Sequence, residues 1–177
     1  QALEISKKLQ DKVSIVSCLH LLGSLYFEKS EKNKALKYYY SAAEITKKLG
    51  GKREMAHHFG IMGFSYGLTG DFDKELEYCN RSFKIKEEIG DKKGIASCCI
   101  SIGFVYWRQG YYDKSLAYFQ HSYDLYKDLG DEVGLLFSYN NLGIAYWMKG
   151  VNKKAESLLN KSLMLQNKIN HKSLKLF

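Results

Sequence analysis

Residues 91–130 read DKKGIASCCISIGFVYWRQGYYDKSLAYFQHSYDLYKDLG, and the pattern within this stretch decides the fold. Apolar residues recur at the three- and four-residue spacing of a helix face in two segments, residues 91–108 and residues 113–129. Gly130 can close the second segment in a left-handed conformation, and Asp131 can cap the helix that follows. No run of strand length alternates between apolar and polar residues, so the stretch predicts a pair of helices.

The rest of the chain repeats this stretch with a period of forty residues. Each repeat carries a glycine with a tyrosine three residues later, at Gly23 and Tyr26, Gly63 and Tyr66, Gly103 and Tyr106, and Gly143 and Tyr146. The predicted repeats are residues 11–50, 51–90, 91–130 and 131–170, preceded by the end of another helix at 1–10 and followed by a tail at 171–177. This register predicts an all-α array of antiparallel helix pairs that forms one domain over residues 1–177.

The glycines in mid-helix are predicted to serve packing, because each costs a helix about 1 kcal/mol relative to alanine and yet recurs. We expect the two helices of a repeat to approach closely there, with a small side chain opposite at Ala35, Ser115 or Ala155 and with Glu75 as the exception. Asp73 and Asp113 each follow a glycine turn and are predicted to cap second helices.

These positions resemble the tetratricopeptide repeat (TPR), in which an apolar residue, Leu-Gly, Tyr, Ala, an aromatic and a small residue recur. The last repeat shows them as Tyr139, Leu142-Gly143, Tyr146, Ala155, Leu159 and Ser162. The usual TPR has about 34 residues and a terminal proline, whereas this chain has no proline and a longer unit. The forty-residue variety is similar to spindle-orientation adaptors, kinesin light chains and the sensor regions of some prokaryotic regulators. The resemblance implies an α-solenoid with a right-handed superhelix whose concave face is lined by the first helices.

The resemblance also implies which side chains line a groove on that face. The predicted partner-binding residues are His20, Phe27, His57, Phe64, Phe104, Trp107, Arg108, Asn140, Ile144 and Trp147. Aromatic residues in a concave patch are typical binding hot spots, so we expect a protein or peptide partner. Trp107 and Trp147 could instead pack between repeats as core, and the sequence leaves both interpretations open. The Lys and Asn clamp of chaperone-binding relatives is absent.

Composition argues against several other functions. The formal charge is +8, but only three arginines occur, so nucleic-acid binding is not expected. The four cysteines form no C-x-x-C pair and are expected to be buried thiols in a reducing compartment, which favours the cytoplasm. His57 and His58 are adjacent and should point to different sides of a helix, so we expect no metal site. No apolar run is long enough to span a membrane.

The function predicted from the sequence is a protein–protein interaction scaffold that binds a peptide or partner segment in its concave groove. No catalytic motif occurs, so we expect neither enzymatic activity nor a cofactor. Two alternatives remain: a structural solenoid that forms homo-oligomers through its uncapped ends, and a sensor arm of a larger regulator or signalling ATPase. The chain starts inside an amphipathic pattern without methionine, and we expect it to be a fragment of a longer protein.

Overall fold

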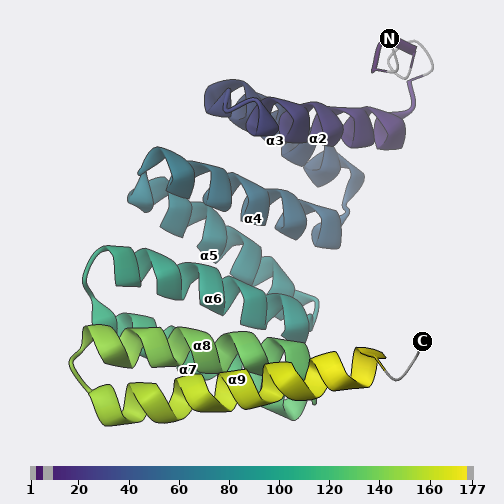
Figure 1. Ribbon diagram of the computed structural model, residues 1–177. Helices are drawn as coiled ribbons and strands as arrows, with labels where there is room; N and C mark the ends of the chain where they lie inside the picture. The colour runs from purple at the N-terminus through teal and green to yellow at the C-terminus, as the bar shows by residue number, and fades with distance from the viewer. Residues whose placement is uncertain (1–2, 6–9, 175–177) are drawn as a thin grey trace. The chain divides into compact units, whose positions relative to one another are not determined.

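The computed structural model describes residues 3–5 and 10–174, in which helices alternate with short turns (Figure 1). The helices are α2 (Lys12–Glu28), α3 (Lys32–Leu49), α4 (Lys52–Thr69), α5 (Phe72–Glu88), α6 (Lys92–Arg108), α7 (Tyr112–Asp128), α8 (Glu132–Met148) and α9 (Asn152–Leu174). No strand occurs among these described residues, which confirms the all-α prediction. Of the preceding helix predicted at 1–10, residues 1–2 and 6–9 lie outside the described residues; of the tail predicted at 171–177, residues 171–174 belong to α9 and 175–177 lie outside the described residues.

The chain forms two compact units, Gln1–Gly90 and Asp91–Phe177, which we call unit 1 and unit 2. Unit 1 contains α2 to α5 and unit 2 contains α6 to α9. In each unit the helices of a pair pack on each other, and the second helix of one pair packs on the first helix of the next. Each unit is therefore a short stack of two helix pairs, as expected of a TPR-type solenoid. The predicted extent of the domain and of its repeats stays a prediction.

Helix ends follow the glycine and aspartate punctuation. Asp91 and Asp131 accept a hydrogen bond from the backbone N–H three residues later, at 3.0 Å and 2.9 Å, which confirms the predicted cap Asp131 and gives Asp91 the same role. Gly130 closes its helix with a φ of 64°. The predicted caps Asp73 and Asp113 are wrong, because α5 and α7 begin one residue earlier than these positions and both aspartates lie in the first helical turn.

The mid-helix glycines allow close contact between the two helices of a repeat, as predicted. A Cβ atom at Gly103 would lie 2.5 Å from the Phe119 ring, and one at Gly63 would lie 2.8 Å from the Cys79 sulfur. The small residues expected opposite are buried, but the nearest atoms at Gly103 belong to the residue one turn later on the second helix. The glycine column therefore makes room for large side chains such as Phe119.

Each unit has its own buried cluster of apolar residues. The cluster of unit 1 consists of Ala35, Tyr39, Ala43, Met62 and Tyr78, and that of unit 2 consists of Phe119, Leu142 and Ala145. These clusters join first and second helices, so they fix how the first helices present their remaining side chains.

Within the described part of the chain, no helix is long and apolar enough to cross a membrane.

Candidate functional site on the first helices

The ten residues predicted to line the groove all lie on first helices. They are His20 and Phe27 on α2, His57 and Phe64 on α4, Phe104, Trp107 and Arg108 on α6, and Asn140, Ile144 and Trp147 on α8. Four belong to unit 1 and six to unit 2, and the contacts described below lie within one unit. We call the surface that these residues form in each unit its first-helix face.

In unit 1, helical spacing brings two pairs of predicted residues together. His20 and Phe27 are seven residues apart, as are His57 and Phe64, and seven residues come close to two helical turns. The ring of Phe27 lies 5.8 Å from that of Phe64, and the ring of His20 lies 5.5 Å from that of His57. Phe27 packs against the unit 1 cluster, whereas Phe64 remains 57% exposed. The first-helix face of unit 1 is thus partly aromatic and partly histidine.

A third histidine, His58, joins the predicted pair. Its ring lies 5.6 Å from His20 and 6.1 Å from His57, and its side chain is only 3% exposed. The sequence predicts that these two neighbours point to different sides of the helix. His57 is exposed and His58 is buried, yet both rings contact His20. Among the described residues, no group of three His, Cys, Asp or Glu side chains is arranged to hold a metal ion.

Burial dominates the electrostatics of this cluster. It lowers the pKa of His58 to about 4, with smaller contributions in the same direction from His20 and His57. Burial also lowers the pKa of His57, and His20 and Lys86 add to the effect. Both imidazoles are therefore neutral at physiological pH.

The second repeat breaks two repeat patterns at once. Gly67 stands where other repeats carry an aromatic residue, and Glu75 stands where they carry a small one. A Cβ atom at Gly67 would lie 2.5 Å from the Glu75 carboxylate, and Glu75 is 4% exposed. The missing side chain at Gly67 thus leaves the space that the Glu75 carboxylate fills.

In unit 2, the predicted aromatic residues divide between packing and exposure. Trp107 is half-buried and meets the Phe104 ring edge-on, with centroids 6.3 Å apart, while Phe104 packs 5.2 Å from buried Phe119. The indole Nε1 of Trp107 is buried without a hydrogen-bond partner among the described residues. Trp147, at the same position one repeat later, is 63% exposed. The two tryptophans occupy the same repeat position but differ in exposure, since Trp107 is half-buried and Trp147 is exposed.

The first-helix face of unit 2 is more apolar than that of unit 1. On α8, Phe137 and Met148 are 52% and 40% exposed, and Asn140 and Ile144 are half-buried. Helix α6 approaches α8 directly, and Arg108 at its end is exposed. The exposed aromatic and thioether groups of α8 can bind apolar side chains, and the Asn140 amide has the groups needed to pair with a peptide backbone.

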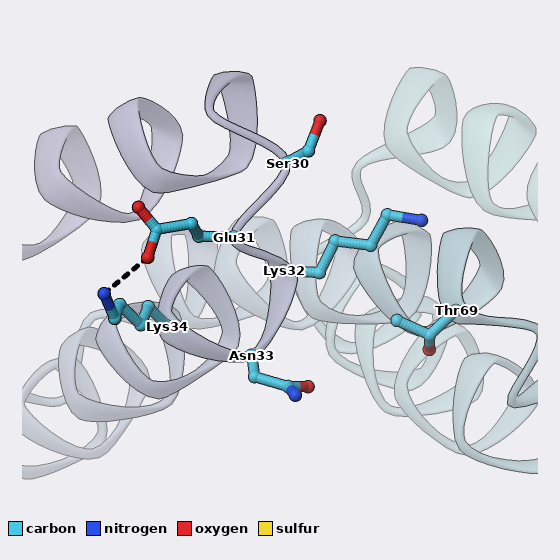
Figure 2. Close-up of a pocket in the computed structure, with 6 residues that line it drawn as sticks. All are labelled: Ser30, Glu31, Lys32, Asn33, Lys34 and Thr69. Atoms are coloured by element: carbon cyan, nitrogen blue, oxygen red, sulfur yellow. Dashed lines mark ion pairs between the residues drawn. The ribbon is translucent and has the colours of Figure 1, made fainter.

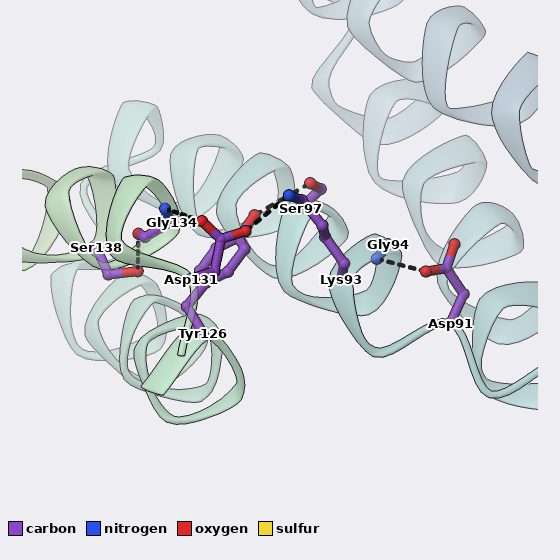
Figure 3. A network of polar contacts seen from close by, with 8 residues as sticks. All are labelled: Asp91, Lys93, Gly94, Ser97, Tyr126, Asp131, Gly134 and Ser138. Carbon is purple, nitrogen blue, oxygen red and sulfur yellow. Dashed lines mark hydrogen bonds and ion pairs between the residues drawn. The ribbon is translucent and has the colours of Figure 1, made fainter. Parts of the chain in front are cut away.

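A polar network stabilises the α7–α8 connection of unit 2 (Figure 3). Lys93 pairs with Asp131 at 2.7 Å, and this hydrogen bond, together with that from the Gly134 N–H, lowers the pKa of the Asp131 carboxyl. Ser97 and the Tyr126 hydroxyl lie 3.3 Å apart, and Ser138 donates to the Gly134 carbonyl. The network fixes where α8 begins, and thus how α8 presents its face.

Two pockets lie at the turns between helices, away from the predicted residues. The one in unit 1 is lined by Ser30, Glu31, Lys32, Asn33, Lys34 and Thr69 (Figure 2). Its equivalent in unit 2 is lined by Gly110, Tyr111, Tyr112, Asp113, Lys114 and Lys149. In the first, the Lys32 ammonium donates to the Leu68 carbonyl at 2.6 Å, and in the second Lys149 pairs with Asp113. These lysines link neighbouring repeats, so we assign the pockets a structural role.

Sequence reasoning missed how two features of unit 1 are connected. The sequence places His58 beside His57 and marks Glu75 as an exception to the repeat, but it does not indicate that His58 meets His20 or that Glu75 fills the space at Gly67. The sequence does indicate which residues are involved in the two contacts. They occupy repeat positions that face each other, either across helices of neighbouring repeats or across the two helices of one repeat. The contact distances alone could not be read from these positions.

Comparison with known families gives two matches, both to models described as Tetratricopeptide repeat. One covers residues 95–168 and the other covers residues 16–49. A comparison with curated proteins found no match.

Solved structures with the same fold are distant in sequence. The kinesin light chain TPR-like repeats of Podosopora anserina are 17% identical, with a TM-score of 0.79 over 96% of this chain and 84% of that one. A signal transduction ATPase of the STAND type with a TPR sensor, from Pyrococcus horikoshii, is 20% identical, with a TM-score of 0.82 over 95% of this chain. The Rap conjugation gene regulator of plasmid pLS20, in complex with the Phr* peptide, is 19% identical, with a TM-score of 0.76 over 90% of this chain.

The chain spans 27% of the STAND protein and 44% of the Rap regulator. At these identities the likeness shows the fold alone. The two family matches and the forty-residue helix pairs support a protein-interaction repeat scaffold. The chain belongs to the tetratricopeptide repeat family.

Proposed function

We propose that the first-helix face of unit 2 binds a peptide or an exposed segment of a partner protein, chiefly through apolar contacts. The observation that carries this proposal is Trp147, which is 63% exposed on α8. Phe137 and Met148 on the same helix are also exposed, at 52% and 40%. Exposed aromatic side chains gathered on one helix mark an interaction surface more often than scattered apolar residues do.

The first-helix face of unit 1 has a weaker apolar position of its own. Phe64 is 57% exposed and leans on half-buried Phe27. Because the Rap regulator of the same fold was solved with a peptide, a peptide is the first class of ligand to test. We propose Arg108, Asn140 and Ile144 as flanking contacts around the aromatic positions.

The test is a selection of random displayed peptides on the intact chain, followed by affinity measurements on the peptides recovered. Trp147→Ala should weaken binding by about 30-fold, as expected for a hot spot of about 2 kcal/mol. Tyr111→Ala is the matched control, since Tyr111 is 55% exposed in unit 2 but lies at a turn outside the face. Selected peptides that bind Trp147→Ala and the wild type equally would contradict the proposal.

Exposed apolar residues on α2 and α9 favour self-association as a second candidate. Leu25 is 45% exposed, whereas its equivalents Ser65, Val105 and Ala145 are fully buried. Leu163 on α9 is 57% exposed. We propose that α9 of one copy can pack on α2 of another, as α7 packs on α8 within unit 2. Light scattering over a range of concentrations tests this, and a monomer at the highest concentration would exclude it.

The expectations about enzymatic activity, compartment, nucleic acid and a sensor arm remain proposals or predictions. Members of this family are generally non-enzymatic scaffolds, and we propose no reaction or cofactor for this chain. Three of the four cysteines are buried, and we propose a reducing compartment such as the cytoplasm. The expectation that the chain does not bind nucleic acid and the alternative of a sensor arm stay predictions.

A further inference from the structure

Three of the five histidines of the chain pack together in unit 1, between α2 and α4. His20 on α2 stacks on His57 at an interplanar angle of 25° and also contacts His58 and the Tyr39 ring. The cluster is thus a direct side-chain link between the two first helices of the unit. Its neighbours on the same face are Phe27 and Phe64, which continue the link.

Two ring nitrogens of this link have no hydrogen-bond partner among the described residues. They are His20 Nε2 and His58 Nδ1, and both atoms are buried. A neutral imidazole can leave a nitrogen unpaired by keeping it as an acceptor, at a modest cost. A charged imidazolium turns that nitrogen into a donor with a full desolvation penalty. The closed arrangement therefore suits neutral rings and disfavours a charged one.

The groups around the cluster do little to favour a charge. Tyr39 of α3 lies against His20, and its hydroxyl bonds to Ser24. Lys86 of α5 acts on His57 and opposes a positive charge there. Glu54 of α4 favours a charge on His58, but burial and the two other histidines outweigh it.

We propose that His20, His57 and His58 form an acid-sensitive latch between α2 and α4, closed while His57 and His58 are neutral and opened when the cluster takes up a proton. Opening separates the two first helices and releases the unit 1 part of the first-helix face. The latch concerns the conformation of unit 1, and it can be measured without any ligand.

The direction of the effect follows from protonation in the open and closed states. The pKa of His58 is about 4 in the closed state and about 6.5 when the ring is free in water. Its contribution to holding the latch is complete above about pH 6.5 and is lost as the pH falls toward about 4. Between about pH 7.5 and about pH 5.5, one such histidine raises the opening constant about tenfold.

Unit 2 supplies the substitutions for the test. The residues at the same repeat positions there are Ile100, Phe137 and Ser138, none of which titrates in this range. The triple variant His20→Ile, His57→Phe and His58→Ser therefore gives unit 1 a junction that the same chain already uses. His121→Gln in unit 2 is the matched control, because His121 is exposed and remote in sequence from the latch.

The experiment is amide hydrogen exchange on the intact chain at about pH 7.5 and about pH 5.5, corrected for the intrinsic pH dependence of exchange. In the wild type and in His121→Gln, the opening constants of α2 and α4 amides should rise about tenfold or more on acidification. In the triple variant the rise should be less than about threefold. Wild-type amides of α2 and α4 whose opening does not change, or a triple variant as acid-sensitive as the wild type, would overturn the proposal.

A second measurement keeps the proposal testable if the triple variant folds poorly. Ring-proton NMR of the wild type should show His58 neutral well below the pH at which an ordinary histidine takes up its proton. A His58 ring that becomes charged near pH 6.5 with α2 and α4 still protected would overturn the latch. Failure of the latch leaves the proposed peptide binding of unit 2 untouched, since that rests on Trp147, and the reverse is also true.

Discussion

Unit 1 and unit 2 are built from the same repeat, but different side chains meet at their corresponding helix junctions. Where α3 meets α4, buried Thr46 and exposed Glu54 both lie near Gly51, whereas where α7 meets α8 the equivalent residues are buried Tyr126 and Gly134. On the first-helix faces, unit 1 has a histidine cluster and unit 2 has exposed Trp147. The repeat therefore fixes the helix pairs, while the side chains that meet at each junction and their burial differ between the units.

The largest expected effect comes from exchanging one partner without the other. A Cβ atom at Gly134 would overlap the ring of Tyr126, which is 5% exposed and cannot move freely. Gly134→Glu, which copies Glu54 of unit 1, should lower the free energy of unfolding by about 3 kcal/mol through overpacking. Urea unfolding followed by circular dichroism measures the loss.

The companion substitution tests whether the two positions form a pair. Adding Tyr126→Thr to Gly134→Glu rebuilds the unit 1 combination and should recover at least half of the lost stability. Each single variant provides the control for the cycle. Additive losses in the double variant would show that the two residues are independent, contrary to the contact between them.

The next effect separates the two tryptophans. Trp107→Ala removes a half-buried ring that packs edge-on against Phe104 and should lower the free energy of unfolding by about 2 kcal/mol. Trp147→Ala removes a ring that is 63% exposed and should change it by less than about 0.5 kcal/mol. Thermal unfolding of both variants decides the point, and equal losses would mean that Trp147 also belongs to the core.

The elements of the fold were predictable from the sequence to different degrees. Helix pairs, the caps Asp91 and Asp131 and the packing role of the mid-helix glycines depend on local chemistry, so they could be inferred from spacing alone. The predicted cap of α5 was wrong: Asp71, two residues before Asp73, takes the capping role predicted for Asp73, and α5 begins at Phe72. Helix ends with several acidic residues offer more than one cap, and the sequence does not rank them.

The candidate site was less predictable because exposure depends on neighbouring helices. The two tryptophans occupy the same repeat position, and the sequence does not indicate that Trp107 on α6 is more buried than Trp147 on α8. The histidine cluster depends on the rotation of α2 against α4, which brings His20 to His57 and His58. Small rotations of long helices lie beyond what a periodic pattern specifies.

A smaller effect is expected at the turn between the two helices of a repeat. Ser30 has a φ of 60°, in the left-handed region, whereas Gly110 takes the same place in unit 2 with a φ of 80°. Ser30→Gly should therefore raise the free energy of unfolding by about 0.5–1 kcal/mol, and Gly110→Ser should lower it by a similar amount. Thermal unfolding of the two reciprocal variants measures this, and a Ser30→Gly chain that melts below the wild type would contradict the strain.

The smallest effect concerns one ion pair that the two units build with opposite polarity. Lys52 at the start of α4 pairs with Glu88 at the end of α5 at 2.9 Å, whereas Glu132 at the start of α8 pairs with Lys168 of α9 at 2.7 Å. An acidic residue at a helix start suits the helix dipole, and an acidic residue at a helix end opposes it. Unit 2 therefore has the better arrangement.

Exchanging the polarity tests this directly. The double variant Lys52→Glu with Glu88→Lys keeps the pair but gives unit 1 the polarity of unit 2, so its Tm should rise by about 1–2 °C at low salt. The reverse exchange at Glu132 and Lys168 should lower the Tm by a similar amount. Both shifts should shrink in high salt, because exposed charges are screened. Shifts of the same sign in both units would show that the intact pair, rather than its orientation on the helices, sets the contribution.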